Sequence, residues 1–510
     1  MKLASLFKNH MIVQRNREIP VWGEGTDGEE IVVRFAGREV KTTVSNGRWE
    51  VRLSAMEAGV YEELNVTNGA QTIILTDIAV GEVWIAGGQS NMEFLYKYDA
   101  ERIPDDLIVE DSLLRFYDVP KVSYEGQFEI GHYEDYGIWR TWRGGDAKWF
   151  SAVGAYFGHK LRSELKIPIG IIGCNWGGCN AITWTSPERI AEHSELKEIV
   201  KQYSEYVSTL DRLQYERATD YISSRDPKPE RDFVDHALMG KSVREFRERL
   251  MAEKPEWERE YEALNMEIGP RSFRRPSGLY EYMLKKVLPV EIRGTIWYQG
   301  EEDERERAGF YDISLRAVID TFRDRWPDMP FLAVQLPPFE GEYIYISQKY
   351  PVIRRQIEKV AETVPRTWCC CTTDCGDRNN IHPRNKRKVG LRLALLALKH
   401  IYKKEIDADS PKFLELVRGK GEITLKFAYA ESGLFCPDAE IRALEVIADG
   451  CKILPDISFI RDTIVLEDEI FFAAKEIIIR YGMENYSKPN IYAHNGLPLF
   501  PFEAAAAGYI

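Results

Sequence analysis

Hydrophobic and polar residues alternate with a period of two through most of the first 80 residues. Such alternation indicates short strands with one buried face. The clearest runs are 30–35, 41–44 and 49–53, and glycine- and asparagine-rich turns separate them. Short strands divided by regular turn signals are typical of a β-sandwich. We therefore predict an N-terminal β-sandwich over residues 1–80, without catalytic residues of its own.

Residues 81–402 follow a different pattern, in which short apolar runs alternate with amphipathic helical segments. This alternation is typical of a parallel sheet covered by helices on both faces. We predict an α/β catalytic domain here. The apolar runs are 83–86, 169–172, 292–297 and 331–335, and the helices include 153–165 and 311–325.

Two further segments depart from this pattern. Charged amphipathic helices interrupt it at about 186–275, so we predict a helical insertion that acts as a lid, as a surface for a homodimer, or as a passive excursion. After residue 402 the period of two returns, for example at 422–427 and 463–466. We predict a second β-sandwich-like domain over residues 403–510.

Composition excludes several classes of protein. The 510 residues are 44% hydrophobic and 12% aromatic, as in ordinary globular proteins. The net charge of −13 and the lack of a basic block argue against nucleic acid and membrane surfaces as partners. No apolar run reaches the roughly 18 residues of a membrane span. The first residues lack the apolar region of a signal peptide, so we expect a cytoplasmic protein.

A serine follows closely after the apolar run 83–86, in Gly87-Gly88-Gln89-Ser90-Asn91-Met92. Two glycines allow a tight turn that exposes the serine at the carboxyl end of a strand. There Ser90 can act as a nucleophile, and its own N–H can stabilise an oxyanion. The missing final glycine of a Gly-x-Ser-x-Gly elbow argues against an α/β-hydrolase. On spacing alone, a turn with a capping serine is the alternative.

His382 is the best candidate for the base that a serine nucleophile needs. Pro383 disfavours a helical conformation at His382, which places the imidazole on a loop before the predicted helix 386–398. The other seven histidines fall within helical or strand patterns or near the termini.

The sequence resembles the SGNH/GDSL hydrolases, in the branch of sialate O-acetylesterases and related carbohydrate acetylesterases. The resemblance covers nearly the whole chain except the insertion, and it implies a flavodoxin-like parallel sheet flanked by two β-sandwich-like domains. The matching blocks are Gly81-Glu82-Val83-Trp84 with Gly88-Gln89-Ser90-Asn91-Met92, Asn175-Trp176-Gly177-Gly178, Ile296-Trp297-Tyr298-Gln299-Gly300-Glu301, and Ile381-His382-Pro383 with Lys386 and Gly390.

The resemblance also implies roles for individual residues. Ser90 and His382 correspond to nucleophile and base. The implied oxyanion hole combines the Ser90 N–H, a backbone N–H at Gly177 or Gly178, and the side-chain amide of Gln299, for which a buried structural amide is the alternative. Asn91 and Trp176 are expected to bind substrate. We expect no metal or organic cofactor, since nucleophile, base and amide donors suffice and the eight cysteines lack zinc-site spacing.

The sequence departs from the family pattern at two places. Asn379 and Asn380 stand where many relatives carry an aspartate near the histidine, and neutral amides cannot stabilise an imidazolium as a carboxylate does. Cys179 replaces a threonine that is usual after the two glycines.

The other ring nitrogen of His382 should therefore donate to a different acceptor, preferably a carboxylate. We predict Glu301, because it lies two residues after Gln299 in the same block. Asp377 is the alternative, followed by Asp374. A further alternative is that a backbone carbonyl orients the ring and Glu301 only ties loops together.

The resulting functional prediction is a serine esterase that removes O-acetyl groups from sugars, similar to sialate O-acetylesterases. Its partner is an acetylated mono- or oligosaccharide. An acetylxylan or acetyl-oligosaccharide esterase of the same mechanism is one alternative. A catalytically weak carbohydrate-binding protein is another, suggested by the flanking β-domains and the missing aspartate. A peptidase or lipase loses support because no elbow motif and no long apolar lid accompany Ser90.

Overall fold

The computed structural model describes residues 1–130, 136–241, 244–266, 268–304, 307–342, 345–346 and 349–507. The chain divides into two compact units. The first unit contains Met1–Glu302, Asp312–Phe331 and Val364–Arg366, and the second contains Asp303–Tyr311, Leu332–Thr363 and Thr367–Ile510.

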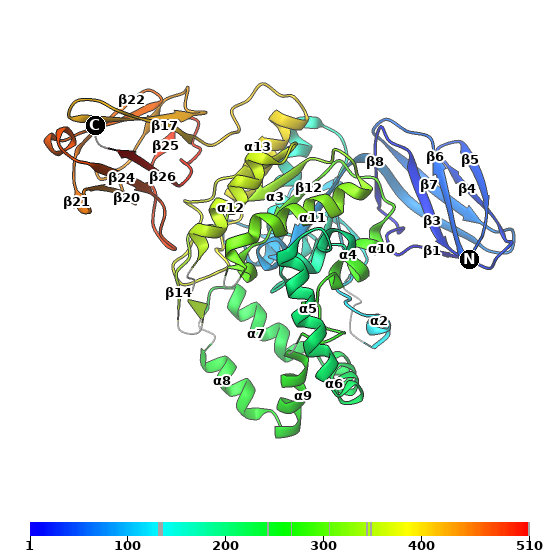
Figure 1. The fold of residues 1–510 in the computed structure, drawn as a ribbon. Helices are drawn as coiled ribbons and strands as arrows, with labels where there is room; N and C mark the ends of the chain where they lie inside the picture. The colour runs from blue at the N-terminus through cyan, green and yellow to red at the C-terminus, as the bar shows by residue number, and fades with distance from the viewer. Residues whose placement is uncertain are drawn as a thin grey trace. The chain divides into compact units, whose positions relative to one another are not determined.

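The first unit begins with two β-sheets (Figure 1). Strands β4, β5 and β6 overlap the three runs predicted from the alternation of residues. One sheet contains β1 (Lys2–Leu3), β3 (Ile19–Glu24) and β6 (Arg48–Leu53), and the other contains β2 (Ile12–Gln14), β4 (Glu30–Phe35), β5 (Arg38–Thr43), β7 (Gly59–Thr67) and the start of β8 (Thr72–Gly88).

Strand β8 is 17 residues long and changes partners along its length. Its first half pairs antiparallel with β7. Its second half, from residue 82 onward, pairs parallel with β11 (Ile169–Asn175) and β12 (Gly294–Tyr298). The predicted boundary at residue 80 falls inside this strand, because the alternating pattern passes into the apolar run without a turn.

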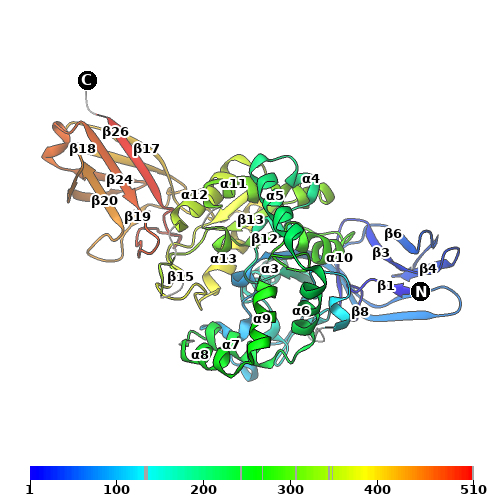
Figure 2. The same cartoon turned by 60° about the horizontal axis from the view of Figure 1, so that its bottom comes forward.

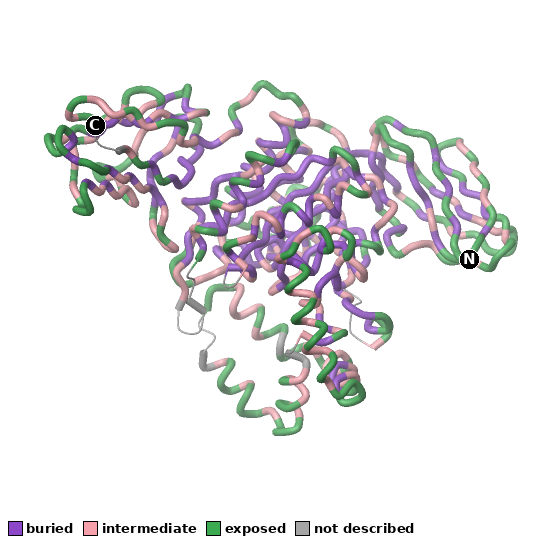
Figure 3. Tube along the Cα trace, viewed as in Figure 1, coloured by how far each residue is buried: buried purple, intermediate pink, exposed green. Residues whose placement is uncertain are grey.

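The central sheet of the first unit has the order β10-β9-β11-β8-β12. Strand β9 (Asp111–Asp118) is parallel to β11, whereas β10 (Trp139–Trp142) is antiparallel to β9. Helix α3 (Ala152–Leu165) packs Phe157 against Trp84, and α11 (Tyr311–Arg325) packs Phe322 against Trp297. Buried residues follow these strands (Figure 3). The protein is thus mixed α/β with a large mixed sheet.

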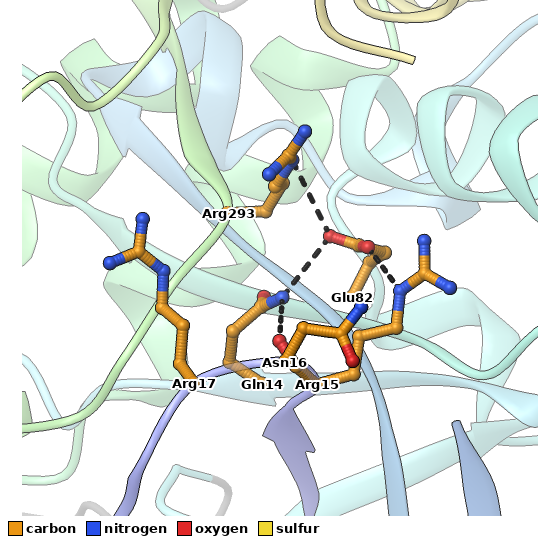
Figure 4. Close-up of a pocket in the computed structure, with 6 residues that line it drawn as sticks. All are labelled: Gln14, Arg15, Asn16, Arg17, Glu82 and Arg293. Carbon is orange, nitrogen blue, oxygen red and sulfur yellow. Dashed lines mark hydrogen bonds and ion pairs between the residues drawn. The ribbon is translucent and has the colours of Figure 1, made fainter. Parts of the chain in front are cut away.

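A polar network joins the N-terminal strands to the central sheet (Figure 4). Glu82 of β8 is buried, and its carboxylate accepts hydrogen bonds from Arg15 Nε at 2.6 Å and from Gln14 Nε2 at 3.3 Å. Gln14 Oε1 in turn accepts the N–H of Val83 at 2.9 Å. A pocket of about 330 Å³ is lined by Gln14, Arg15, Asn16, Arg17, Glu82 and Arg293. The network lies at the opposite end of the parallel part of β8 from Ser90, and we interpret it as structural.

The predicted insertion consists of successive helices. The hydroxyl of Ser186 accepts the N–H of Arg189 at 3.3 Å and so caps the first of them. Tyr221 of α6 packs against Trp257 of α9, and α6 to α9 lie together in both views (Figures 1 and 2). The helices are α4 (Pro187–Ile190), α5 (Ser194–Thr209), α6 (Arg212–Ser224), α7 (Lys228–Leu238), α8 (Arg244–Glu253) and α9 (Glu256–Met266).

The second unit contains an additional β-sheet domain at its C-terminal end. Two antiparallel sheets enclose alternating buried residues such as Ile423, Leu425, Ile477 and Ile479. One sheet has β17 (Lys412–Arg418), β18 (Glu422–Ala428), β23 (Thr463–Glu467) and β22 (Asp456–Ile460), and the other β21 (Cys451–Ile453), β20 (Leu444–Ala448), β24 (Glu476–Tyr481) and β26 (Phe502–Ala507). The same unit holds α12 (Tyr350–Thr363), β16 (Thr367–Cys370) and α13 (Arg387–Leu396).

Candidate active site

Ser90 stands where β8 turns into the short helix α1 (Ser90–Glu93). Gly88 has a φ of 131°, and a Cβ at this position would lie 2.1 Å from the carbonyl oxygen of Tyr298. A Cβ at Gly87 would lie 2.8 Å from the ring of Trp297. Both glycines are therefore required for β8 to pass β12 this closely. The turn leaves Ser90 half-buried at the carboxyl end of the strand.

The loop after β12 is tied to this turn by buried amides. Gln89 Oε1 accepts a hydrogen bond from Gln299 Nε2 at 3.2 Å and another from the Gly300 N–H at 3.4 Å. Gln299 Nε2 also donates to the carbonyl of Cys179 at 3.2 Å. Gln299 thus lies between the Ser90 turn and the glycine block. The two hydrogen bonds use both hydrogens of the Gln299 amide, as the alternative of a structural amide requires. The role of Gln299 as an oxyanion donor stays a prediction.

Glu301 lies beside the nucleophile helix. Asn91 is fully buried, and its Nδ2 donates to Glu301 Oε1 at 2.5 Å. The predicted orienting carboxylate is therefore held by the residue that directly follows Ser90.

The glycine block follows β11 and lies against Ser90. A Cβ at Gly177 would lie 3.1 Å from the Cβ of Ser90. The two N–H groups proposed for the oxyanion hole differ in their surroundings. The Gly177 N–H donates to Glu93 Oε2 at 2.6 Å, whereas the Gly178 N–H donates to no acceptor within the described part of the chain. Gly178 is therefore the better candidate of the pair.

Charged residues that the sequence reasoning missed adjoin this block. Glu93 Oε1 pairs with the buried ammonium of Lys121. Burial raises the pKa of nearby Asp118 to about 7, although the charge of Lys121 acts in the opposite direction. The only sequence signal was the position of Glu93, three residues after Ser90.

Cys179, which stands in the place of the usual threonine, is hydrogen-bonded on both sides. Its thiol is buried, accepts the indole N–H of Trp184 at 3.0 Å and donates to the carbonyl of Gly88 at 3.5 Å. We therefore assign Cys179 a structural role.

An aromatic pair lies next to the glycine block. The rings of Trp176 and Phe273 stack with centroids 4.8 Å apart and planes at 2°. Arg274 lies 5.5 Å from the centroid of Phe273, and its Nη2 comes within 3.3 Å of the Cβ position of Gly178. Phe273 and Arg274 were not predicted, because they lie at the end of the insertion, for which no role had been resolved.

In the second unit His382 lies on a loop before α13, as predicted. Asn380 Oδ1 accepts the N–H of His382 at 2.9 Å. Asp377 Oδ1 accepts the N–H groups of Asn379 at 3.0 Å and Asn380 at 2.9 Å, which folds the loop as an Asx turn. Burial and then the charge of Lys386 lower the pKa of His382 to about 3. His382 is therefore neutral at pH 7, as a base must be.

The two alternative acids have other partners. Asp377 is exposed and accepts backbone N–H groups. Asp374 binds Arg392 at 2.6 Å and Lys388 at 2.8 Å. Burial alone would raise the pKa of Asp374, but these two cations hold it below its usual value. The pairing of His382 with Ser90 and Glu301 stays a prediction.

Within the described ranges, no helix combines the length and apolarity of a membrane span. Nor do three or more His, Cys, Asp or Glu side chains of those ranges form a group that could hold a metal ion.

Comparisons with known proteins agree with the predicted family. Residues 264–399 match the family model described as carbohydrate esterase, sialic acid-specific acetylesterase. The human sialate O-acetylesterase is 24% identical over 511 residues, covering 89% of this chain and 82% of the relative. The mouse enzyme is 23% identical over 469 residues, covering 84% and 79%.

A solved structure supports the fold. The crystal structure of a carbohydrate acetylesterase from Xanthomonas citri matches with a TM-score of 0.75 and 24% identity, and the match covers 99% of both chains. Together the comparisons confirm the predicted resemblance to sialate O-acetylesterases and related carbohydrate esterases.

Proposed function

We propose that this protein is a serine esterase that removes O-acetyl groups from sugars, with acetylated sialic acid as the first substrate class to test. The observation that carries this proposal is the packing of Ser90 against the Gly177–Gly178 block beside Gln299. The family resemblance adds the reaction class. The parallel strands β9, β11, β8 and β12 support an SGNH-type, flavodoxin-like core.

The reaction proceeds through an acetyl-enzyme. Ser90 Oγ attacks the acetyl carbonyl carbon while His382 accepts its proton, and the carbonyl oxygen becomes an oxyanion. The N–H groups of Ser90 and Gly178 and the amide of Gln299 stabilise this charge. The sugar leaves as an alcohol with the proton from His382. Water, deprotonated by His382, then attacks acetyl-Ser90 and releases acetate.

Glu301 is the proposed partner of the imidazolium that forms in each step. Its carboxylate is buried, and Asn91 holds one of its oxygens. A carboxylate fixed in this way can orient the ring and stabilise its positive charge. Asp377 is the alternative.

Sugar binding is assigned to the surface beside the glycine block. The stacked Trp176 and Phe273 offer an aromatic edge for the apolar face of a sugar ring. Arg274 adds a planar cation suited to the carboxylate of an acidic sugar. This cation favours sialic acid over neutral xylan fragments. A cytoplasmic location, which suits small imported sugars, is part of the proposal.

Acetate release tests the proposal directly. The panel contains 9-O-acetyl sialic acid, acetylated xylo-oligosaccharides, acetylated manno-oligosaccharides and p-nitrophenyl acetate. We expect turnover of p-nitrophenyl acetate and the highest kcat/KM for the sialic acid ester. Turnover of the neutral sugars alone would favour the acetylxylan esterase, and no turnover of any ester would favour a sugar-binding protein.

Replacing Gln299 by alanine should lower kcat by about 10²- to 10³-fold, the usual cost of one oxyanion donor. Gln202→Ala, an exposed glutamine on α5, is the control. Steady-state kinetics with p-nitrophenyl acetate and a melting curve of each variant provide the measurement. A raised KM with unchanged kcat would assign Gln299 to substrate binding instead.

Replacing Lys386 by methionine should move the acid limb of the activity profile to higher pH. A base works in its neutral form, so kcat/KM falls as the pH drops through its pKa. The charge of buried Lys386 helps to lower the pKa of His382 to about 3. Without this charge the pKa rises, and protonation removes the base at a higher pH. Profiles of kcat/KM against pH for Lys386→Met and for the exposed control Arg387→Met check this. If the two variants and the wild-type protein gave the same profile, Lys386 would not affect the pKa of the catalytic base.

A further inference from the structure

Glu93 forms a hydrogen bond with the backbone of the glycine block. Among the described residues of the site, it is the only charged side chain that does so. Its Oε2 accepts the Gly177 N–H at 2.6 Å, and its Oε1 pairs with Lys121 Nζ. Charge-assisted hydrogen bonds of this kind are short and strong. The bond therefore fixes the peptide group between Trp176 and Gly177.

The same helix carries the nucleophile. Ser90 and Glu93 are three residues apart on α1, a spacing that places side chains on one face of a helix. A Cβ at Gly177 would lie 3.1 Å from Ser90 Cβ and 3.3 Å from Glu93 Oε2. One glycine thus lies beside the nucleophile and is hydrogen-bonded to Glu93. We therefore expect a shift of the Glu93 carboxylate to move the Gly177 peptide relative to Ser90.

The positive charge of Lys121 compensates the negative charge of Glu93. A carboxylate near a developing oxyanion repels it, and this effect is strong where water is excluded. The Lys121 side chain is 8% exposed and bonds Glu93 directly. The pair is neutral overall, so Glu93 can hold the Gly177 N–H without opposing the reaction.

We propose that Glu93, held by Lys121, is a positioning residue for the esterase reaction: it occupies the Gly177 N–H and thereby presents the Gly178 N–H as the oxyanion donor. The inference rests on the proposed function. Gly178 has a φ of 75°, and its N–H has no acceptor within the described residues. The family resemblance implied a donor at either Gly177 or Gly178, and this assignment selects Gly178.

The test compares variants that keep or remove the acceptor oxygen. Glu93→Ala removes it. The double variant Glu93→Gln with Lys121→Met keeps an acceptor oxygen and removes both charges, so it leaves no buried cation unpaired. Glu125→Ala, an exposed glutamate, is the matched control. The full-length protein is assayed with p-nitrophenyl acetate, with kcat, KM and the melting temperature measured for each variant.

We expect Glu93→Ala to lower kcat on the order of 10- to 100-fold with KM nearly unchanged, the size of effect that a small misplacement near the reacting atoms produces. The double variant should recover most of kcat. Wild-type kcat in Glu93→Ala would overturn the proposal. Equal loss of kcat in both variants with a lowered melting temperature would also overturn it, in favour of a purely structural role. If the wild-type protein hydrolyses no ester, the proposed function fails first, and the two failures are distinguished.

Discussion

Replacing Ser90 by alanine is expected to lower kcat by about 10⁴- to 10⁶-fold, because the nucleophile and its base act as a unit. Two described neighbours of Ser90 are already engaged in hydrogen bonds and are poor replacements for it. Asn91 is buried against Glu301, and the thiol of Cys179 bonds the Gly88 carbonyl and Trp184. The residual rate reflects the oxyanion donors and substrate binding alone.

The measurement is kcat for p-nitrophenyl acetate and for the best sugar ester. Ser163→Ala, an exposed serine on α3, controls for the substitution itself. Near-normal turnover in Ser90→Ala would remove Ser90 from the mechanism. A comparable loss in Ser163→Ala would point to misfolding or to the assay.

Replacing His382 by alanine should cost roughly as much as the loss of Ser90. His400 cannot substitute, because it pairs with Asp409 at 2.8 Å. His159 cannot either, since its half-buried ring packs on Trp142, and desolvation lowers its pKa to about 4.

A double variant sharpens this prediction. If Ser90 and His382 act in one step, the variant that lacks both should be no slower than Ser90→Ala alone. Steady-state kinetics of the two single variants and the double variant provide the comparison. If the loss of kcat in the double variant equalled the product of the two single losses, the residues would act independently, and this would contradict the mechanism.

Local patterns predicted much of this fold. The alternation at residues 30–35 became β4, and the glycines before Ser90 became the tight turn after β8. A serine directly before a proline is a typical helix N-cap, and Ser186 caps α4 in this way. In each case residues close in the sequence determine the local structure, so a short stretch of sequence is enough to predict it.

The rest depends on residues that are distant in the sequence. Phe273 meets Trp176 across almost one hundred positions, and Lys121 reaches Glu93 across 28. No periodicity connects such partners. The antiparallel strand β10 and the continuation of β8 across residue 80 were missed for the same reason. The choice between Gly177 and Gly178 likewise needed the Glu93 contact, which sequence spacing does not reveal.

The most direct test of the central claim is to trap the acetyl-enzyme. The protein is mixed with p-nitrophenyl acetate, quenched in acid within one turnover, digested and analysed by mass spectrometry. The mechanism predicts a single acetyl group on the peptide that contains Ser90, absent from Ser90→Ala. An acetyl group on another residue, or turnover by the native protein with no acetylated peptide at any quench time, would contradict it.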